Sequence, residues 1–320
     1  MNEPDMTAYA LWIAAAALMG LAGFVISGKK LPRKTAQRAA ALAVPMAVIG
    51  ARLLYSTVRI RWFGEIGFEN FLWPADPDHN YWGDAQGFGL WGAAAGTVFA
   101  AWIASSRDRK RFAETLDCMA PWAAVTIGLS RFGEFLIGEG YGLYVENEAL
   151  WFFPVAVVDE WSAKYAVFML EGLAALIIAA ILFTAGRKYS GGNRARLFLI
   201  LYSSCQIILE SLRQDQCLRW QFMKVSQLIS ALVLAGLIIA AARRDMKKPE
   251  AQRMSTVRRA VCISLFAACV VIVVLLEFAI DKSPTLPVWA AYVLETLCCA
   301  VMCAVTLALV IPGKNRGMEE

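Results

Sequence analysis

Nine stretches of the chain are long and apolar enough to cross a membrane. Each holds about 20 mostly apolar residues, which is the length of α-helix that a hydrocarbon core of roughly 30 Å requires. These stretches predict helices at residues 8–27, 38–58, 87–105, 115–137, 164–185, 197–212, 222–242, 258–280 and 286–311. The pattern therefore predicts an all-α polytopic membrane protein with about nine spans.

The composition also argues against an ordinary soluble domain. Hydrophobic residues make up 59% of the 320 residues, and the mean hydropathy is +0.53, which exceeds the usual range of soluble proteins. The segment Met1–Met6 is acidic and lacks the positive region of a signal peptide, so we expect the first helix to be retained. Most of the eight cysteines lie in apolar stretches, and His79 is the sole histidine. We therefore expect no disulfide framework, no metal site and no cofactor.

Lysine and arginine residues are distributed unevenly between alternate loops. One set of loops, together with the carboxyl terminus, carries 22 of the 31 Lys and Arg residues, and the opposite set carries 6. Because cytoplasmic loops are enriched in these residues, we expect the amino terminus outside and the carboxyl terminus in the cytoplasm. The net charge of +5 arises in inner loops that face anionic lipid, so it implies no nucleic-acid partner.

Several charged residues lie within the predicted helices, where ionisable groups are rare and often mark functional sites. A rise of about 1.5 Å per residue places four of them at one level in the outer half of the membrane. These four are Arg52, Arg131, Glu210 and Arg213.

Helical spacing groups these charges on two faces. Arg131, Glu134 and Gly138 share one face of the helix at 115–137, with Glu139 about a quarter turn away. A second stripe on the helix at 197–212 is formed by Gln206, Glu210 and Arg213. We expect the two polar faces to meet.

Two functions fit such a cluster. Guanidinium groups bind phosphate oxygens through paired hydrogen bonds, so the arginines suit a phospholipid headgroup. The alternative is a structural set of ion pairs that locks two helices together. Similarly, Gly138, Gly140 and Gly142 permit positive φ and close backbone approach to a ligand, or else tight helix packing.

The order and spacing of these residues resemble the bacterial prolipoprotein diacylglyceryl transferase family. The family motif Arg-[Ile/Leu]-Gly-Asn-Phe-Ile-Asn-Gly-Glu-x-x-Gly is similar to the unbroken stretch Arg131–Gly142. Other segments are similar to the family in the same order along the chain. They are Tyr9–Leu11, Gly50–Tyr55 and Phe112–Pro121 before this stretch, and Glu210–Asp215 and Ser226–Gln227 after it. The resemblance implies a seven-helix transferase-like membrane domain at residues 1–243, followed by an additional two-helix membrane segment at 244–320.

The chain departs from the family pattern at three polar positions. Trp91 stands where the family has a histidine implicated in activity, Glu134 replaces the motif asparagine, and Gln206 replaces an arginine. The family's His-Pro-Ser-Gln-Leu-Tyr motif aligns only loosely with Trp161–Tyr165. These differences suggest a divergent member that keeps its headgroup arginines and has altered part of the catalytic set.

The resemblance implies transfer of a diacylglyceryl group from phosphatidylglycerol to the lipobox cysteine thiol of prolipoproteins. The reaction would take place at the outer leaflet of the bacterial inner membrane, with phosphatidylglycerol, lipobox-containing preproteins and membrane lipids as partners. Two alternatives remain open. One is a non-catalytic phospholipid-binding accessory protein, and the other is a related transferase with a different acceptor.

Candidate residues follow from the resemblance and from the charge of the departing phosphate. Cations directed at that phosphate lower the barrier, and a buried carboxylate of raised pKa can deprotonate the thiol. We expect catalytic roles for Arg131, Glu139 and Glu210, and substrate-binding roles for Arg52, Tyr9, Glu134, Gly142 and Arg213.

Overall fold

The computed structural model describes residues 5–28, 31–58, 88–106, 108–159, 162–214, 218–220, 223–250, 253–282 and 287–311. The chain divides into two compact units. The first comprises Met1–Ala195 and Leu212–Ser226, and the second Arg196–Ser211 and Gln227–Glu320. The expected boundary between a transferase-like segment and a two-helix segment at residue 243 is a different division, and it stays a prediction.

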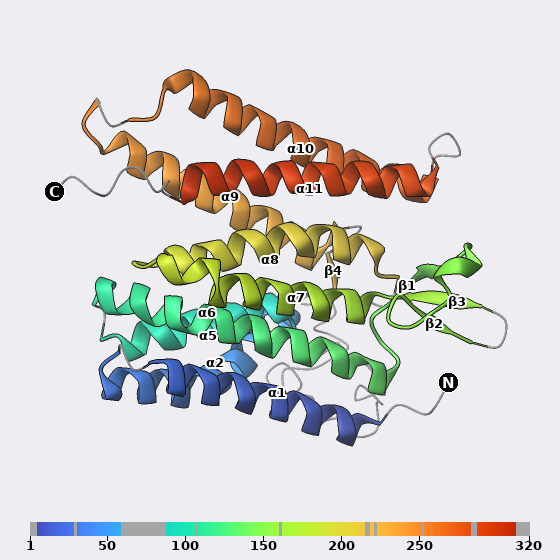
Figure 1. Ribbon diagram of the computed structural model, residues 1–320, viewed down its shortest axis with the longest axis horizontal. Helices are drawn as coiled ribbons and strands as arrows, with labels where there is room; N and C mark the ends of the chain where they lie inside the picture. The colour runs from blue at the N-terminus through green and yellow to red at the C-terminus, as the bar shows by residue number, and fades with distance from the viewer. Residues whose placement is uncertain are drawn as a thin grey trace. The chain divides into compact units, whose positions relative to one another are not determined.

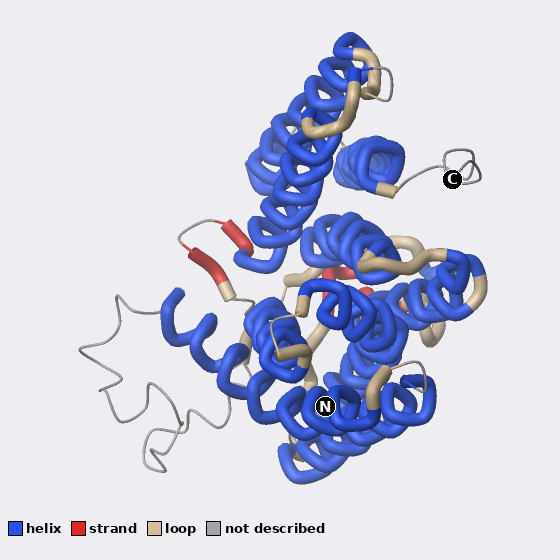
Figure 2. Tube along the Cα trace, turned by 90° about the vertical axis from the view of Figure 1, so that its left-hand side faces the viewer, coloured by secondary structure: helices blue, strands red, loops and turns tan. Residues whose placement is uncertain are grey.

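The first unit is a bundle of apolar helices, which Figure 2 views close to end-on. Its long helices are α1 (Met6–Ser27), α2 (Arg33–Val58), α5 (Leu90–Ala104), α6 (Arg109–Phe132), α7 (Val167–Phe183) and the beginning of α8 (Asn193–Leu212). The most extensive packing joins α2 to α5, α6 to α7, and α1 to α6 (Figure 1). The described part of this unit also contains the short 3-10 helices η5 (Gly133–Ile137), η6 (Glu148–Leu150) and η7 (Ala185–Lys188).

Carboxylates fix the ends of two helices in this unit. Asp108 caps α6 by accepting a hydrogen bond from the backbone N–H of Lys110 at 2.9 Å. Asp117, which is buried within α6, accepts from the backbone N–H groups of Gly192 at 2.7 Å and Ala195 at 2.9 Å. These donors satisfy the buried carboxylate. They also fasten the start of α8 to α6.

Glycines allow α2 and α5 to pack closely. A Cβ atom at Gly50 would lie 3.1 Å from the backbone nitrogen of Gly96 and would also meet the backbone of Gly92. Small residues are typical of helix contacts in membranes, where close packing drives association. This contact holds the segment that carries Arg52 against the helix that carries Trp91.

Short strands connect the helices of the first unit. β1 (Tyr141–Tyr144), β2 (Ala156–Val158) and β3 (Ala163–Ala166) form an antiparallel sheet in the order β1-β3-β2, and β4 (Arg219–Trp220) pairs with β5 (Met223–Lys224). The three-stranded sheet lies beside the beginning of α7 (Figure 1). Strands of three or four residues are too short to be distinguished by hydrophobic periodicity, so the sequence did not predict them.

The second unit consists of most of α8 together with α9 (Val225–Met246), α10 (Thr256–Lys282) and α11 (Val288–Val310). All four helices contribute to one hydrophobic core, which includes Ile207, Leu234, Phe266 and Met302. The last two helices therefore share a core with α8 and α9.

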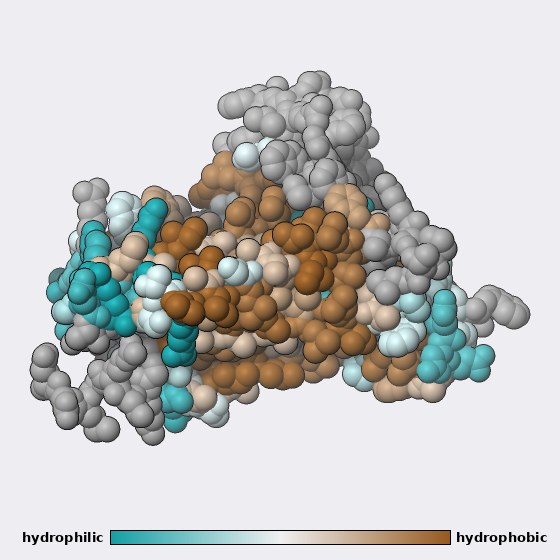
Figure 3. All heavy atoms as spheres, turned by 90° about the horizontal axis from the view of Figure 1, so that it is seen from above, coloured by the Kyte–Doolittle hydropathy of each residue, from teal (hydrophilic) through white to brown (hydrophobic). Residues whose placement is uncertain are grey.

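The described helices confirm an all-α, multi-pass membrane protein. Six of them are long and apolar enough to cross a membrane, namely α1, α2, α8, α9, α10 and α11, while α5 and α7 are shorter apolar helices. On the face shown in Figure 3, hydrophobic side chains gather along the middle and hydrophilic ones toward both ends. The count of nine spans and the orientation of the termini stay predictions.

Candidate functional site

Arg131 and Glu134 lie at the end of α6, where the helix changes its geometry. The α-helix ends at Phe132 and continues as the 3-10 helix η5, which Gly138 terminates in the left-handed conformation. The predicted α-helix to residue 137 is therefore wrong in its last turn, because this glycine-rich segment adopts tighter turns. The predicted contact is nevertheless confirmed, since Arg131 Nη1 donates to Glu134 Oε1.

These two residues belong to a closed ring of four alternating charges. Glu171 Oε2 lies 3.0 Å from Arg131 Nε and 3.2 Å from Arg213 Nη1. Glu134 Oε2 lies 3.3 Å from Arg213 Nη2. We call Arg131, Glu134, Glu171 and Arg213 the charge ring, in which each member contacts two members of opposite sign. No side chain of the ring is more than 13% exposed, so mutual neutralisation offsets much of the cost of burying the charges.

Glu171 is the member of the charge ring that sequence reasoning missed. It projects from α7, whose other sixteen residues are uncharged, and it is 3% exposed. A single charge within a short apolar helix is itself a signal of a functional or paired group. Its partners are 40 and 42 residues away in the chain, so spacing within one helix could not identify them.

Arg213 reaches the ring from just beyond α8. The helix ends at Leu212, and Arg213 forms a β-bridge with Gly142. The predicted stripe of Gln206, Glu210 and Arg213 on one helix is therefore wrong at its last member, because backbone pairing with Gly142 redirects the chain. Gln206 and Glu210 lie in the second unit, where the Gln206 amide donates to Glu210 Oε2 at 2.9 Å.

The predicted backbone freedom of the glycine segment is confirmed at two positions. Gly138 has a φ of 69° and Gly140 a φ of 79°. A Cβ atom at Gly140 would lie 2.6 Å from Glu134 Oε2. Between these glycines, the half-buried Glu139 donates its backbone N–H to the carbonyl of Glu134 at 3.1 Å. The segment thus wraps closely around the Glu134 carboxylate.

Tyr9 approaches the same charges from α1. Its phenol lies within electrostatic range of Glu134, Arg131, Glu139 and Arg213. The start of α1 is tied to η5 by a hydrogen bond from the backbone N–H of Asp5 to the carbonyl of Leu136, at 3.0 Å.

Arg52 is buried on α2, and its guanidinium carbon lies 5.4 Å from the centre of the Tyr55 ring. Cation–π contact of this kind partly replaces the hydration of a buried cation.

Trp91, at the position of the family histidine, is buried on α5. Among the described residues, no group of three His, Cys, Asp or Glu side chains is placed to hold a metal ion.

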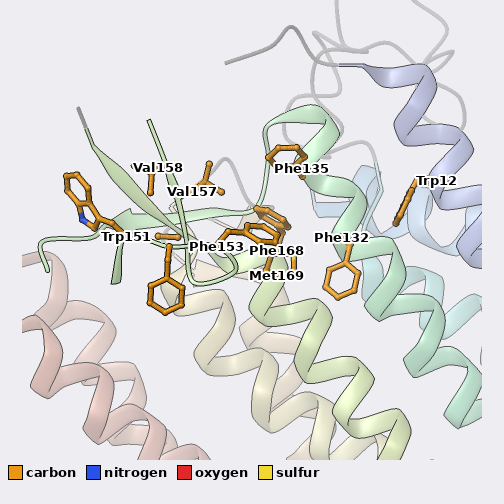
Figure 4. A pocket seen from close by; sticks show the side chains of 11 residues that line it. Trp12, Phe132, Phe135, Trp151, Phe153, Val157, Val158, Phe168 and Met169 are labelled. Carbon is orange, nitrogen blue, oxygen red and sulfur yellow. The ribbon is translucent and has the colours of Figure 1, made fainter. Parts of the chain in front are cut away.

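An apolar cavity of about 670 Å³ adjoins the end of α6. We call it the aromatic cavity, because most of its lining is aromatic (Figure 4): Trp12, Phe132, Phe135, Trp151, Phe152, Phe153 and Phe168, with Ala156, Val157, Val158 and Met169. Phe168 donates its backbone N–H to the carbonyl of Gly140 at 2.9 Å. The Tyr141 and Phe168 rings pack edge to face, and burial raises the pKa of the Tyr141 phenol.

The aromatic cavity and the charge ring share two short segments of the chain, residues 131–135 and 168–171. Phe132 and Phe135 in the cavity lining directly follow Arg131 and Glu134 of the ring in sequence. An apolar space beside buried arginines suits an amphiphile with an anionic group. The fold and site thus define a class, namely multi-pass α-helical membrane proteins with a buried charge cluster and an apolar cavity at the end of one helix.

Comparison with known proteins gives the family. The profile of the family described as prolipoprotein diacylglyceryl transferase matches residues 3–242. This chain belongs to the prolipoprotein diacylglyceryl transferase family.

Similar proteins include three named phosphatidylglycerol–prolipoprotein diacylglyceryl transferase. The one from Frankia alni is 30% identical over 251 residues, which cover 75% of this chain and 63% of that protein. The one from Clostridium novyi is 24% identical over 62% of this chain and 75% of that protein. The one from Streptococcus pneumoniae serotype 4 is 26% identical over 65% of this chain and 78% of that protein. This chain thus spans less than two thirds of the length of the Frankia protein.

Proposed function

We propose that this protein transfers the diacylglyceryl group of phosphatidylglycerol to the lipobox cysteine thiol of a preprotein. The observation that carries the proposal is the position of the charge ring beside the aromatic cavity. The ring offers guanidinium groups to a phosphate, while the cavity accommodates apolar chains. Names of the relatives point to the same donor and the same class of acceptor.

The proposed reaction exchanges one bond at the glyceryl carbon that carries the phosphate. The cysteine sulfur forms a thioether bond to this carbon as the carbon–oxygen bond breaks, and glycerol phosphate departs with the bonding electrons. The thiol proton passes to a carboxylate, for which Glu139 is our candidate, and Glu210 is the second. Negative charge develops on the departing phosphate, and Arg131 and Arg213 stabilise it.

The two carboxylates of the charge ring position the arginines for this role. Glu171 contacts both guanidinium groups, and Glu134 contacts both through other nitrogen atoms. Such fixed donors stabilise a developing charge without reorganising during the reaction. Tyr9, Arg52 and the Gly142 backbone complete the proposed substrate-binding set.

The proposed place of reaction is the outer leaflet of the bacterial inner membrane. The predicted topology puts the end of α6 and the beginning of α7 on the outer side. An exported preprotein would present its thiol there while its own apolar segment remains in the membrane.

One experiment tests the proposal directly. Purified protein is incubated with phosphatidylglycerol labelled in both glycerol moieties and with a lipobox peptide, and the thioether product and released glycerol phosphate are measured. We expect both products in equal amounts. Lipid binding without either product would favour the accessory-protein alternative. Product on a thiol peptide without a lipobox would favour a different acceptor.

Arg131 provides the first mutational prediction. Arg131→Ala should lower the transfer rate by about 100-fold or more, because removing one fixed group that stabilises developing charge has this size of effect. Arg131→Lys should recover little of the transfer rate. The guanidinium contacts Glu134 through Nη1 and Glu171 through Nε, whereas a lysine ammonium has a single nitrogen. Full activity of Arg131→Ala would remove this residue from the site.

A further inference from the structure

A hydrogen-bonded link joins α10 to the part of the second unit that matches the family. The side-chain nitrogen of Gln227, near the start of α9, donates to Glu277 Oε1 on α10 at 2.6 Å. The same nitrogen donates to the carbonyl of Ile207 on α8 at 3.1 Å. Gln227 and Ile207 lie inside the family match at residues 3–242, and Glu277 lies outside it.

The two bonds fix the orientation of the Gln227 side chain. A carboxylate acceptor makes a stronger hydrogen bond than a neutral one, and the low local dielectric of a partly buried site strengthens it further. Glu277 and Gln227 are both partly buried. Because both N–H groups have acceptors in fixed helices, the amide cannot rotate without losing one of them.

The link also holds a functional part of α8. The Ile207 carbonyl lies in the turn next to Gln206 and Glu210, which are themselves hydrogen-bonded at 2.9 Å. The side chain of Glu277 is held in place because α10 shares a hydrophobic core with α8 and α9, through residues such as Val273 and Ile207. A displacement of this turn would move Glu210.

We propose that Glu277 is a positioning residue for transfer, acting through Gln227 on the last turns of α8. This inference rests on the proposed function, in which Glu210 is a candidate base. It implies that the two carboxy-terminal helices are part of the working enzyme rather than a separate anchor.

Activity measurements test the proposal with three variants. Glu277→Leu should lower kcat about tenfold, the size typical of losing an orienting partner. KM for phosphatidylglycerol should stay within about twofold, because the proposed role of Glu277 is exerted through Gln227 and not on the lipid. Glu277→Gln should retain most of the activity, since its amide oxygen still accepts from Gln227. The control Leu275→Ala, on the same helix and 62% exposed, should match the unsubstituted protein.

A double substitution separates a specific link from general damage to the fold. The double variant Gln227→Leu, Glu277→Leu should have a kcat no lower than that of the slower single variant, because both changes remove the same hydrogen bond. Fully additive losses would overturn the link. Equal losses in Glu277→Gln and Glu277→Leu would also overturn it, because the hydrogen bond is kept only in the former.

Hydrogen exchange provides a measure that does not depend on activity. Amide exchange of residues 208–212 should become at least about threefold faster in Glu277→Leu than in Leu275→Ala, because the α8 end opens more often. Unchanged exchange would overturn the proposal. If Glu277→Leu exchanges faster but keeps the kcat of the unsubstituted protein, the link only stabilises the fold, and the proposed role in transfer is overturned. Faster exchange in a protein that never transfers lipid would refute the proposed function and leave the structural link intact.

Discussion

At the scale of single residues, the charge ring explains how two arginines can be buried in an apolar bundle. Arg131 and Arg213 carry two positive charges, and Glu134 and Glu171 carry two negative ones, so the ring is neutral. Neutrality lets the arginines be in place before any lipid arrives. An approaching phosphate then competes with carboxylates for the guanidinium groups. Under the proposed function, the ring combines the two roles that the sequence left open, because the ion pairs that stabilise the site also orient the arginines that are proposed to bind the headgroup.

Glu171 provides a residue-scale prediction. Glu171→Gln keeps the shape of the side chain but removes the charge that both arginines contact, so we expect a lower unfolding temperature and a transfer rate reduced by about tenfold or more. Glu171→Asp keeps the charge and serves as the matched control, with an intermediate loss due to its shorter reach. Thermal unfolding in detergent and the transfer assay measure the two effects. Unchanged stability and rate in Glu171→Gln would show that the ring does not depend on this charge.

At the scale of elements, the segment from Arg131 to Gly142 shows what sequence reasoning can and cannot predict. The Arg131–Glu134 contact and the positive φ of Gly138 and Gly140 were predictable because they depend on local spacing and on glycine itself. The place of Glu171 in the charge ring and the pairing of β3 with β1 both depend on chain segments that are distant in sequence. Such pairings follow from packing of whole helices, which local patterns do not encode.

Gly140 provides an element-scale prediction with an internal control. Gly140→Ala meets two penalties: a left-handed backbone at φ 79°, and a Cβ that would lie 2.6 Å from both Glu134 Oε2 and Phe168 Cβ. Gly191→Ala meets the backbone penalty alone, since its φ is 65° and nothing lies within 4 Å of its Cβ. We expect Gly191→Ala to cost about 1–2 kcal/mol of stability with unchanged activity. Gly140→Ala should cost more and abolish transfer, and equal behaviour of the two variants would contradict the close packing around Glu134.

At the scale of the whole molecule, hydrophobic runs predict where the helices lie, and they do not predict which helices form a compact unit. Each of the nine apolar runs corresponds to a helix among the described residues, although α6 begins at Arg109 and α7 at Val167 rather than at the predicted positions. The division into two compact units was not predicted, because α8 contributes residues to both. Hydropathy reports which segments avoid water, and it does not report which helices share a core.

The topology provides the last prediction, and it decides whether the proposed site faces exported substrates. The excess of Lys and Arg in one set of loops, 22 against 6, predicts that residue 320 and the loop at 187–196 are cytoplasmic and that residue 150 is external. A phosphatase that is active only outside should therefore be active when fused after residue 150, and inactive after residue 190 or 320. A fluorescent reporter that folds only in the cytoplasm should give the opposite pattern, which controls for failed expression. Because the charge ring joins the end of α6 to the beginning of α7, residue 150 reports the side on which the ring lies. The same side for residues 150 and 320 would contradict the nine-span arrangement. A cytoplasmic residue 150 would in addition put the ring out of reach of a preprotein that has crossed the membrane.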